Sequence, residues 1–164
     1  FVRIGNFFNS EINGKPTDEA FLFATKFVRD ADDMPAYQAV SLTKELSADA
    51  AYKAIASDPA FNEILEAIPF RHPVQLYEAF AYIGIFALMY FVFYPNKQWR
   101  EKPGFLFGFW LSAVFAARFV LEYFKKSQGG FEETLGLLST GQWLSIPLVL
   151  AGLYLMFRPQ PSQG

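Results

Sequence analysis

Two residues of opposite charge, Arg118 and Glu122, lie in an otherwise apolar stretch of the sequence. Four positions apart on a helix, they would project from one face and could form an ion pair. A charge at the centre of a membrane span costs at least about 2.5 kcal/mol on insertion scales, so ionisable residues there tend to be paired and functional. Glu122 lies near the end of the stretch, where a side chain can extend partly toward water. A functional pair and a purely structural pair both remain open.

A second polar group lies in residues 1–16, FVRIGNFFNSEINGKP, which we expect to form an irregular loop because it combines glycines, asparagines and a proline. Its charged and amide residues are Arg3, Asn6, Asn9, Glu11 and Asn13. The arginine fork matches phosphate oxygens, and asparagine side chains can orient an ester or a glycerol. Loops rich in Asn and Gly are equally typical of tight turns. The residues alone leave both interpretations open.

A third group opens the next apolar stretch, in the segment RHPVQLYEAF at residues 71–80. Gln75 and Glu78 are three positions apart, so they can share a helix face that points into a bundle. His72 is the only histidine of the chain. It can be a general base, because imidazole titrates near neutrality, or a structural residue at a helix entrance.

The composition excludes several kinds of chemistry. The sequence contains no cysteine, so the chain supplies neither a thiol nucleophile nor a Cys-ligated metal site. A single histidine argues against a metal site, and no phosphate-cradling glycine loop or zinc spacing is found. The formal charge of −2 disfavours nucleic-acid binding. We therefore expect no metal and no cofactor.

The elements that position these residues are membrane helices. Three apolar stretches, 74–94, 105–124 and 138–157, each approach the roughly 20 residues that a helix needs to cross a bilayer. We therefore predict an all-α integral membrane protein, a polytopic helical bundle. Pro147 is tolerable in the third span where neighbouring helices satisfy the freed carbonyl. In the same span, Gly141, Ala151 and Gly152 would allow close approach of another helix.

Residues 17–73 form an arm outside the spans, with short helices and extended segments. Residues 21–29 are aromatic and β-branched enough to be extended, although a short helix fits almost as well. Between residues 36 and 67 we expect two or three short helices, with Ser47 and Asp58 as N-caps. The charges of these helices are typical of solvated faces.

The loops predict an orientation. Loop 95–104 has three basic residues against one acid, so we place it in the cytoplasm. The arm and loop 125–137 would then be periplasmic, and the tail 158–164 cytoplasmic. The chain starts without Met and without a signal peptide, so we expect it to be a fragment of a longer protein with further upstream spans.

Four segments resemble, in order, the motifs of the prolipoprotein diacylglyceryl transferase family. They are RIGNFFNSEINGKPTD at 3–18, RHPVQLYEA at 71–79, ARFVLEYF at 117–124 and STGQWLSIPLVLAG at 139–152. The arm between the first two segments matches none of the motifs. The resemblance implies transfer of the diacylglyceryl group of phosphatidylglycerol to the lipobox cysteine of a prolipoprotein signal peptide, in the bacterial cytoplasmic membrane. The nucleophile would belong to the substrate, which fits a chain without cysteine.

The resemblance also implies roles for individual residues. Arg3 and Asn6 would hold the lipid headgroup, and Glu11 and Gly14 would complete the same loop. Arg118 would stabilise the departing phosphate, while Glu122 would orient Arg118 or polar groups of the substrate. We add Gln75 and Glu78 as substrate-binding candidates, and expect all these residues to form one lipid-headgroup site.

The sequence departs from the family pattern at two positions. Ser10 stands where the family commonly has Gly, and Val114 stands where Tyr is frequent, so no hydroxyl role is expected at position 114. An important histidine of the family lies upstream of this chain, so its role is not transferred to His72, and we expect the chain alone to be inactive. Two other hypotheses remain: a transporter or channel segment with Arg118 and Glu122 along a polar path, and a non-catalytic membrane subunit.

Overall fold

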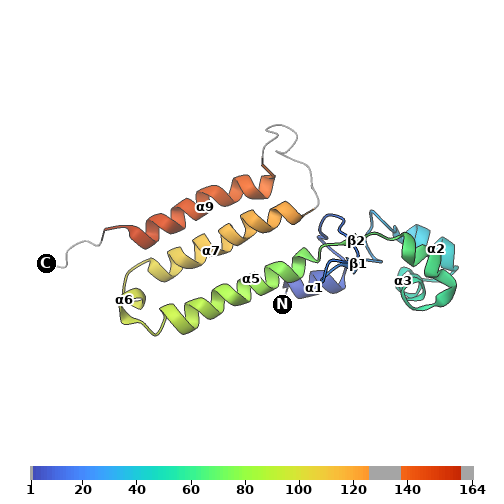
Figure 1. The fold of residues 1–164 in the computed structure, drawn as a ribbon, viewed down its shortest axis with the longest axis horizontal. Helices are drawn as coiled ribbons and strands as arrows, with labels where there is room; N and C mark the ends of the chain where they lie inside the picture. Colours follow the sequence, from blue (N-terminus) through green and yellow to red (C-terminus); the bar gives the residue numbers. More distant parts are fainter. Residues whose placement is uncertain (1, 126–137, 160–164) are drawn as a thin grey trace. The chain divides into compact units, whose positions relative to one another are not determined.

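The computed structural model of the protein describes residues 2–125 and 138–159 (Figure 1). Within these residues the chain forms two compact units, which divide after Leu76 and again after Tyr123. The first unit contains residues 2–76 and 124–125, and the second contains residues 77–123 and 138–159. Nearly all of the predicted loop 125–137 and most of the tail 158–164 lie outside the described residues.

The arm belongs to the first unit and contains the expected short helices. They are α2 (Ala36–Thr43), α3 (Ala48–Ser57), the 3₁₀ turn η1 (Pro59–Phe61) and α4 (Asn62–Ala67). Ser47 caps α3 by accepting a hydrogen bond of 3.3 Å from the Ala50 amide, and Asp58 caps η1 by accepting one of 2.9 Å from the Ala60 amide. The predicted helices and caps of the arm are therefore confirmed.

These helices enclose a small apolar core. Its buried members are Met34, Ala39, Ala51, Tyr52, Ile55 and Ile68. The Tyr52 hydroxyl donates a 3.0 Å hydrogen bond to the Met34 carbonyl, and burial raises the pKa of this phenol above its usual value. The arm thus has a core of its own, in which small and large apolar side chains pack together.

Two short strands complete the first unit. Strand β1 (Thr25–Lys26) pairs antiparallel with β2 (Phe70–Arg71), with Thr25 opposite Arg71. The extended structure predicted for residues 21–29 is therefore limited to β1, and residues 21–24 form a turn. The few strand residues leave the prediction of an all-α protein intact.

The beginning of the chain differs from the prediction. Residues Val2–Phe8 form helix α1, where we expected an irregular loop. Gly5 and Asn6 weaken a helix by about 1 kcal/mol at most each, and the ring of Phe7 packs edge-on against buried Phe27 at 5.7 Å. Tertiary packing of an apolar face thus outweighs local propensity. The loop prediction holds for the residues after the helix, where Ser10 and Ile12 both have positive φ.

The second unit contains most of the apolar helices. Helix α5 (Val74–Leu88), which starts in the first unit, continues as the π-helical turn η2 (Met89–Phe93). After the short α6 (Lys97–Arg100) come α7 (Phe105–Leu121), the 3₁₀ turn η3 (Glu122–Phe124) and α9 (Thr140–Phe157). Three continuous segments, Val74–Phe93, Phe105–Phe124 and Thr140–Phe157, are long and apolar enough to cross a membrane. Their bounds agree with the predicted spans to within two residues.

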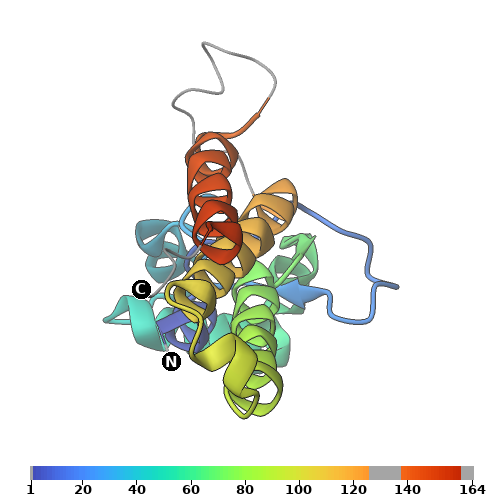
Figure 2. The same ribbon diagram turned by 90° about the vertical axis from the view of Figure 1, so that its left-hand side faces the viewer.

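Helices α7 and α9 run side by side in both views (Figure 1 and Figure 2). They are close because glycines face each other: a Cβ atom at Gly152 would lie 2.6 Å from the Gly108 carbonyl oxygen and would also collide with the Ser112 hydroxyl. That hydroxyl donates a 3.3 Å hydrogen bond to the Val149 carbonyl. Gly152 therefore has the predicted role, whereas Ala151 is exposed because it lies on the other side of α9.

We expect Gly152→Ala to destabilise the α7–α9 pair by about 1–3 kcal/mol, because the new methyl group forces the two backbones apart. Thermal unfolding of the purified protein in detergent measures the effect. Gly84→Ala is the matched control, since a Cβ atom there meets nothing within 4 Å. Equal unfolding temperatures for the two variants would contradict this description of the interface.

Candidate active site

A buried amide network shapes the loop that follows α1. The Asn13 side chain donates hydrogen bonds to the Ser10 carbonyl (2.8 Å) and to the Asp30 carboxylate (3.0 Å). Its oxygen accepts one of 2.8 Å from the Gln75 amide, which also donates to the Glu11 carbonyl at 2.7 Å. Gln75 is only 1% exposed, so it fixes the backbone path of residues 11–13.

One polar atom of the Gln75 side chain has no hydrogen-bond partner within the described residues. Its Oε1 atom is buried and accepts no hydrogen bond within the described parts of the chain. A buried acceptor without a donor is costly, and each such atom in a native protein calls for an explanation. The predicted role of Gln75 in substrate binding would give this oxygen a donor.

Arg71 is the residue of this unit that sequence reasoning missed. Its guanidinium is 4% exposed and binds the Asp33 carboxylate with two hydrogen bonds, of 2.7 and 2.6 Å. It also lies 3.5 Å from the Asp30 carboxylate and donates to the Gly14 carbonyl at 3.2 Å. The hydrogen bond to Asp33 raises the pKa of Arg71 against the opposing effect of burial, and nearby acidic charges add to it. Arg71 thus ties the arm to the loop.

Residues 14–17 lie between the two chain segments that adjoin the first two spans. On one side the Gly14 amide donates to the His72 carbonyl at 3.0 Å, and the His72 amide donates to the Lys15 carbonyl at 3.1 Å. On the other side the Lys15 amide donates to the Phe124 carbonyl at 2.8 Å. The segment before α5 and the end of η3 are therefore held together by the residues that follow the loop.

Gly14 is buried in this arrangement. A Cβ atom at this position would lie 2.5 Å from the His72 carbonyl oxygen and 2.7 Å from the Val74 side chain. Real Cβ atoms do not approach backbone oxygens so closely, so the backbone would have to move. Gly14 therefore allows close packing, in addition to any contact with a substrate.

We expect Gly14→Ala to destabilise the first unit by about 1–3 kcal/mol, because the methyl group overpacks a backbone contact. Gly5→Ala is the matched control: a Cβ atom at Gly5 meets nothing within 4 Å, and alanine favours helix over glycine. Amide hydrogen exchange at Gly14, Lys15 and Thr17 measures the effect. Unchanged protection in the Gly14 variant would show that the contact is not tight in solution.

The other predicted residues of the first unit are more accessible. Arg3 and Asn6 are half-buried on α1, three positions apart and thus on one face of the helix, and the Glu11 side chain is exposed. His72 packs between two aromatic rings, 4.9 Å from Phe21 and 5.4 Å from Phe124. This packing favours the structural interpretation of the histidine.

Arg118 lies on α7 and Glu122 in the turn η3 that follows it, both within the second apolar segment, as predicted. Helix α7 ends at Leu121, and the carboxylate of Glu122 lies against Gly141 in the first turn of α9, where a Cβ atom would come within 2.6 Å of it. The positive end of the α9 dipole favours a carboxylate there. No ion pair joins Arg118 and Glu122 among the residues described.

The N–H donors of the Arg118 guanidinium have no acceptor among the described residues. The guanidinium is half-buried and lies 5.9 Å from the centre of the Phe115 ring. Across residues 2–125 and 138–159, it forms no hydrogen bond. On α5, Glu78 is 1% exposed and follows Gln75 by three positions, so the predicted shared face is buried. An arginine inside a span whose five donors are uncommitted is suited to bind an anion.

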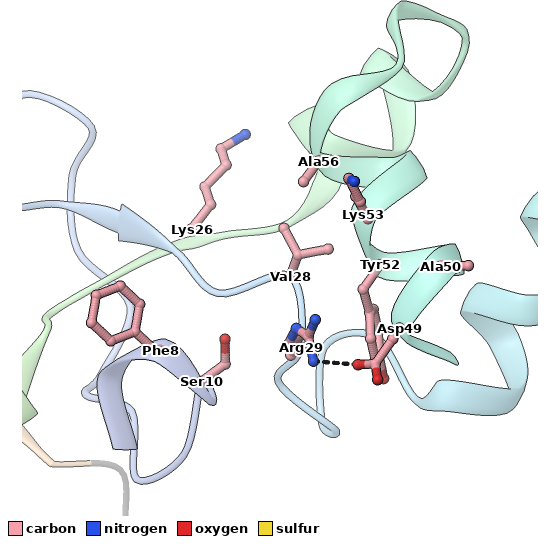
Figure 3. A pocket seen from close by; sticks show the side chains of 10 residues that line it. All are labelled: Phe8, Ser10, Lys26, Val28, Arg29, Asp49, Ala50, Tyr52, Lys53 and Ala56. Atoms are coloured by element: carbon pink, nitrogen blue, oxygen red, sulfur yellow. Dashed lines mark hydrogen bonds and ion pairs between the residues drawn. The ribbon is translucent and has the colours of Figure 1, made fainter. Parts of the chain in front are cut away.

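A pocket of about 510 Å³ opens in the first unit (Figure 3). Its charged lining residues are Lys26, Arg29, Asp49 and Lys53. Arg29 pairs with the exposed Asp49 at 2.6 Å, and Lys26 donates to the Leu65 carbonyl at 2.7 Å. None of the predicted site residues lines this pocket, so it is separate from the candidate active site.

The comparison with known families shows to which family the chain belongs. The family model described as prolipoprotein diacylglyceryl transferase matches residues 1–158. The chain belongs to this family. The matched range includes the arm, which resembled none of the motifs.

Named relatives in this family agree with the match. A phosphatidylglycerol–prolipoprotein diacylglyceryl transferase of Tolumonas auensis is 40% identical over 95% of this chain, and relatives of the same name from Bacteroides fragilis and Chloroherpeton thalassium are each 36% identical over 96%. The chain spans only 45%, 42% and 44% of these three relatives. No solved structure matches the chain. The family assignment and the three spans establish a multi-pass membrane protein.

Proposed function

We propose that this chain carries part of an enzyme that transfers the diacylglyceryl group of phosphatidylglycerol to the lipobox cysteine of a prolipoprotein. The cysteine sulfur forms a bond to the glycerol carbon that bears the phosphate, and the carbon–oxygen bond to that phosphate breaks. The thiol proton is released, and glycerol phosphate leaves. The products are a thioether-linked diacylglyceryl lipoprotein and a phosphate monoester. Family membership supports this function over a transport path or a non-catalytic subunit.

The observation that carries the proposal is the state of Arg118. It lies in a span, is half-buried, and its guanidinium forms no hydrogen bond within the described residues. The leaving phosphate gains negative charge as the carbon–oxygen bond breaks, and a fixed cation in a dry site stabilises that charge strongly. The fork of Arg118 can bind two phosphate oxygens at once. Glu122, held at the first turn of α9, would bind polar groups of the substrate.

The loop after α1 supports a headgroup site. The Oε1 atom of Gln75 is a buried acceptor that a glycerol hydroxyl could supply with a donor. Arg3 and Asn6 would contact the phosphate and the glycerol from α1, with Glu11 and Gly14 in the same loop and Glu78 on the buried face of α5. The Gly14 and Lys15 amides donate hydrogen bonds to the His72 and Phe124 carbonyls, which ties this loop to residues at or beside the ends of the first two spans.

We place this face in the periplasm and the enzyme in the bacterial cytoplasmic membrane. The basic loop 95–104 would be cytoplasmic, which puts the opposite ends of the first two spans outside. Lipid and prolipoprotein would both reach the site from that leaflet. Accessibility of single cysteines at Lys97 and Glu45 to a membrane-impermeant maleimide tests the orientation: only the second should react in intact cells.

One assay tests the function. The full-length protein is reconstituted with phosphatidylglycerol and a peptide that contains a lipobox cysteine, and the thioether product is detected by mass spectrometry. A mass increase that corresponds to one diacylglyceryl group, with release of glycerol phosphate, is expected. A peptide with serine in place of the cysteine is the control. An unmodified cysteine peptide, under conditions in which a relative from the same family is active, would overturn the proposal.

A further inference from the structure

Three consecutive apolar residues, Phe21, Leu22 and Phe23, project from the first unit at a turn. They are 41%, 84% and 54% exposed. The turn is well ordered by its backbone: the Phe21 amide donates to the Asp18 carbonyl at 3.1 Å, and the Ala24 amide donates to the Phe21 carbonyl at 2.9 Å. We refer to residues 21–23 as the apolar turn. A contiguous exposed apolar patch on an ordered turn indicates a binding surface.

The contacts of the apolar turn involve residues at the ends of two apolar helices. The Phe21 ring packs edge-on against the His72 ring at 4.9 Å, and His72 packs against Phe124 at 5.4 Å. His72 lies two residues before the first residue of the Val74–Phe93 span, and Phe124 is the last residue of the Phe105–Phe124 span. The apolar turn therefore begins beside the residues at which two candidate spans end.

We infer that the apolar turn inserts into the lipid interface and helps to anchor the arm on the membrane surface. Aromatic side chains favour the headgroup level of a bilayer. Exposed Phe and Leu side chains lower their free energy when they leave water for the boundary between headgroups and acyl chains. Lipid is the occupant that adjoins both span ends, so no additional partner has to be present. The neighbouring charges, Asp18 and Glu19, are acidic, so insertion depends on apolar contact rather than on attraction to anionic lipid.

The Asp18 carboxylate, next to the apolar turn, does not prevent insertion of the turn into the lipid interface. Asp18 accepts a 2.9 Å hydrogen bond from the Ala20 amide, which holds the carboxylate beside its own backbone. The side chains of the apolar turn can therefore enter the interface while Asp18 stays at headgroup level. The turn would act as a fixed support for the loop at residues 9–14, which is linked to the same His72 backbone.

Spin labelling tests this inference directly. The sequence contains no cysteine, so Leu22→Cys gives one nitroxide site within this chain. The full-length protein, with any cysteines outside this chain replaced, is reconstituted in vesicles of phosphatidylethanolamine and phosphatidylglycerol. Collision rates are measured with oxygen, which concentrates in lipid, and with a nickel chelate, which stays in water. We expect the ratio of oxygen to nickel accessibility to be several-fold higher at Leu22 than at the control site.

Leu46→Cys is the matched control, because Leu46 is a fully exposed leucine in the connection between α2 and α3. A Phe23→Cys label provides a second position in the turn and should also favour oxygen. Equal nickel accessibility at Leu22 and Leu46 would place the turn in water and overturn the inference. Protection from both reagents would do the same, since it would mean that protein covers the turn. Neither readout needs turnover, so the result is independent of the proposed activity.

Discussion

Replacement of Arg118 by alanine is expected to lower kcat for thioether formation by about 10²–10³-fold, the cost of removing a preorganised donor from a developing negative charge. The effect should fall on kcat more than on KM, because the phosphate carries more charge in the transition state than in the bound lipid. Arg118→Lys should recover only part of the rate, since an ammonium group keeps the charge but cannot bind two oxygens in a plane. Steady-state kinetics of the reconstituted protein measure both variants.

Arg158 provides the matched control for this experiment. It is also a half-buried arginine at the end of a span, but it lies at the C-terminal end of α9 and donates to the Pro103 carbonyl at 3.5 Å. Arg158→Ala should leave kcat unchanged. If Arg118→Ala and Arg158→Ala turn over equally fast, Arg118 does not stabilise the leaving phosphate, whatever the enzyme's reaction.

The second large effect is expected at Arg71. Arg71→Met should destabilise the first unit by about 3–5 kcal/mol, because removal of one partner leaves the other charges of a buried cluster uncompensated. Asp33 and Asp30 would then be left near the centre of the unit, with exposed fractions of only 14% and 10% for their side chains. Protection of the Gly14 and Lys15 amides from hydrogen exchange should fall accordingly, since Arg71 also holds the Gly14 carbonyl.

Arg29→Met is the control that separates the effect of ion-pair distance on stability from the effect of burial. Arg29 binds Asp49 at 2.6 Å, the same distance as Arg71 to Asp33, but the Arg29 and Asp49 side chains are 41% and 81% exposed. An exposed pair contributes about 0–1 kcal/mol, because water and salt screen it. Comparable losses in the two variants would mean that burial of the Arg71 cluster is not what stabilises the unit.

The spans could be predicted from the sequence because lipid imposes one requirement on every residue within them. A run of about 20 apolar residues has few alternatives to a membrane helix, and the helices of the arm were marked by caps such as Ser47 and Asp58. Helix α1 was missed because its stability depends on the contact between Phe7 and Phe27, which are distant in the sequence. Local propensity, which Gly5 and Asn6 lower, was the only signal available there.

Only part of the candidate site could be predicted, because some of its contacts also join residues that are distant in the sequence. Family resemblance identified Arg3, Gly14 and Arg118 by position, but the pairing of Arg71 with Asp33 joins residues 38 positions apart and leaves no local pattern. Helix spacing shows that Arg118 and Glu122 can meet, but no ion pair joins them among the described residues. The Glu122 carboxylate lies beside Gly141 of another helix, and local spacing carries no signal of that contact.

The pairing of residues 14–17 has a consequence for biosynthesis. One edge of this segment bonds to residues 70–72, which leave the ribosome before the first span. The Lys15 amide bonds to Phe124, which emerges as the last residue of the second span. During synthesis, the hydrogen bonds to residues 70–72 can form first. The Lys15 amide has its acceptor, the Phe124 carbonyl, only once α7 has been made and inserted. The last hydrogen bond of this segment is thereby coupled to insertion of the second span, so a protein arrested before that step would lack the contact between Lys15 and Phe124.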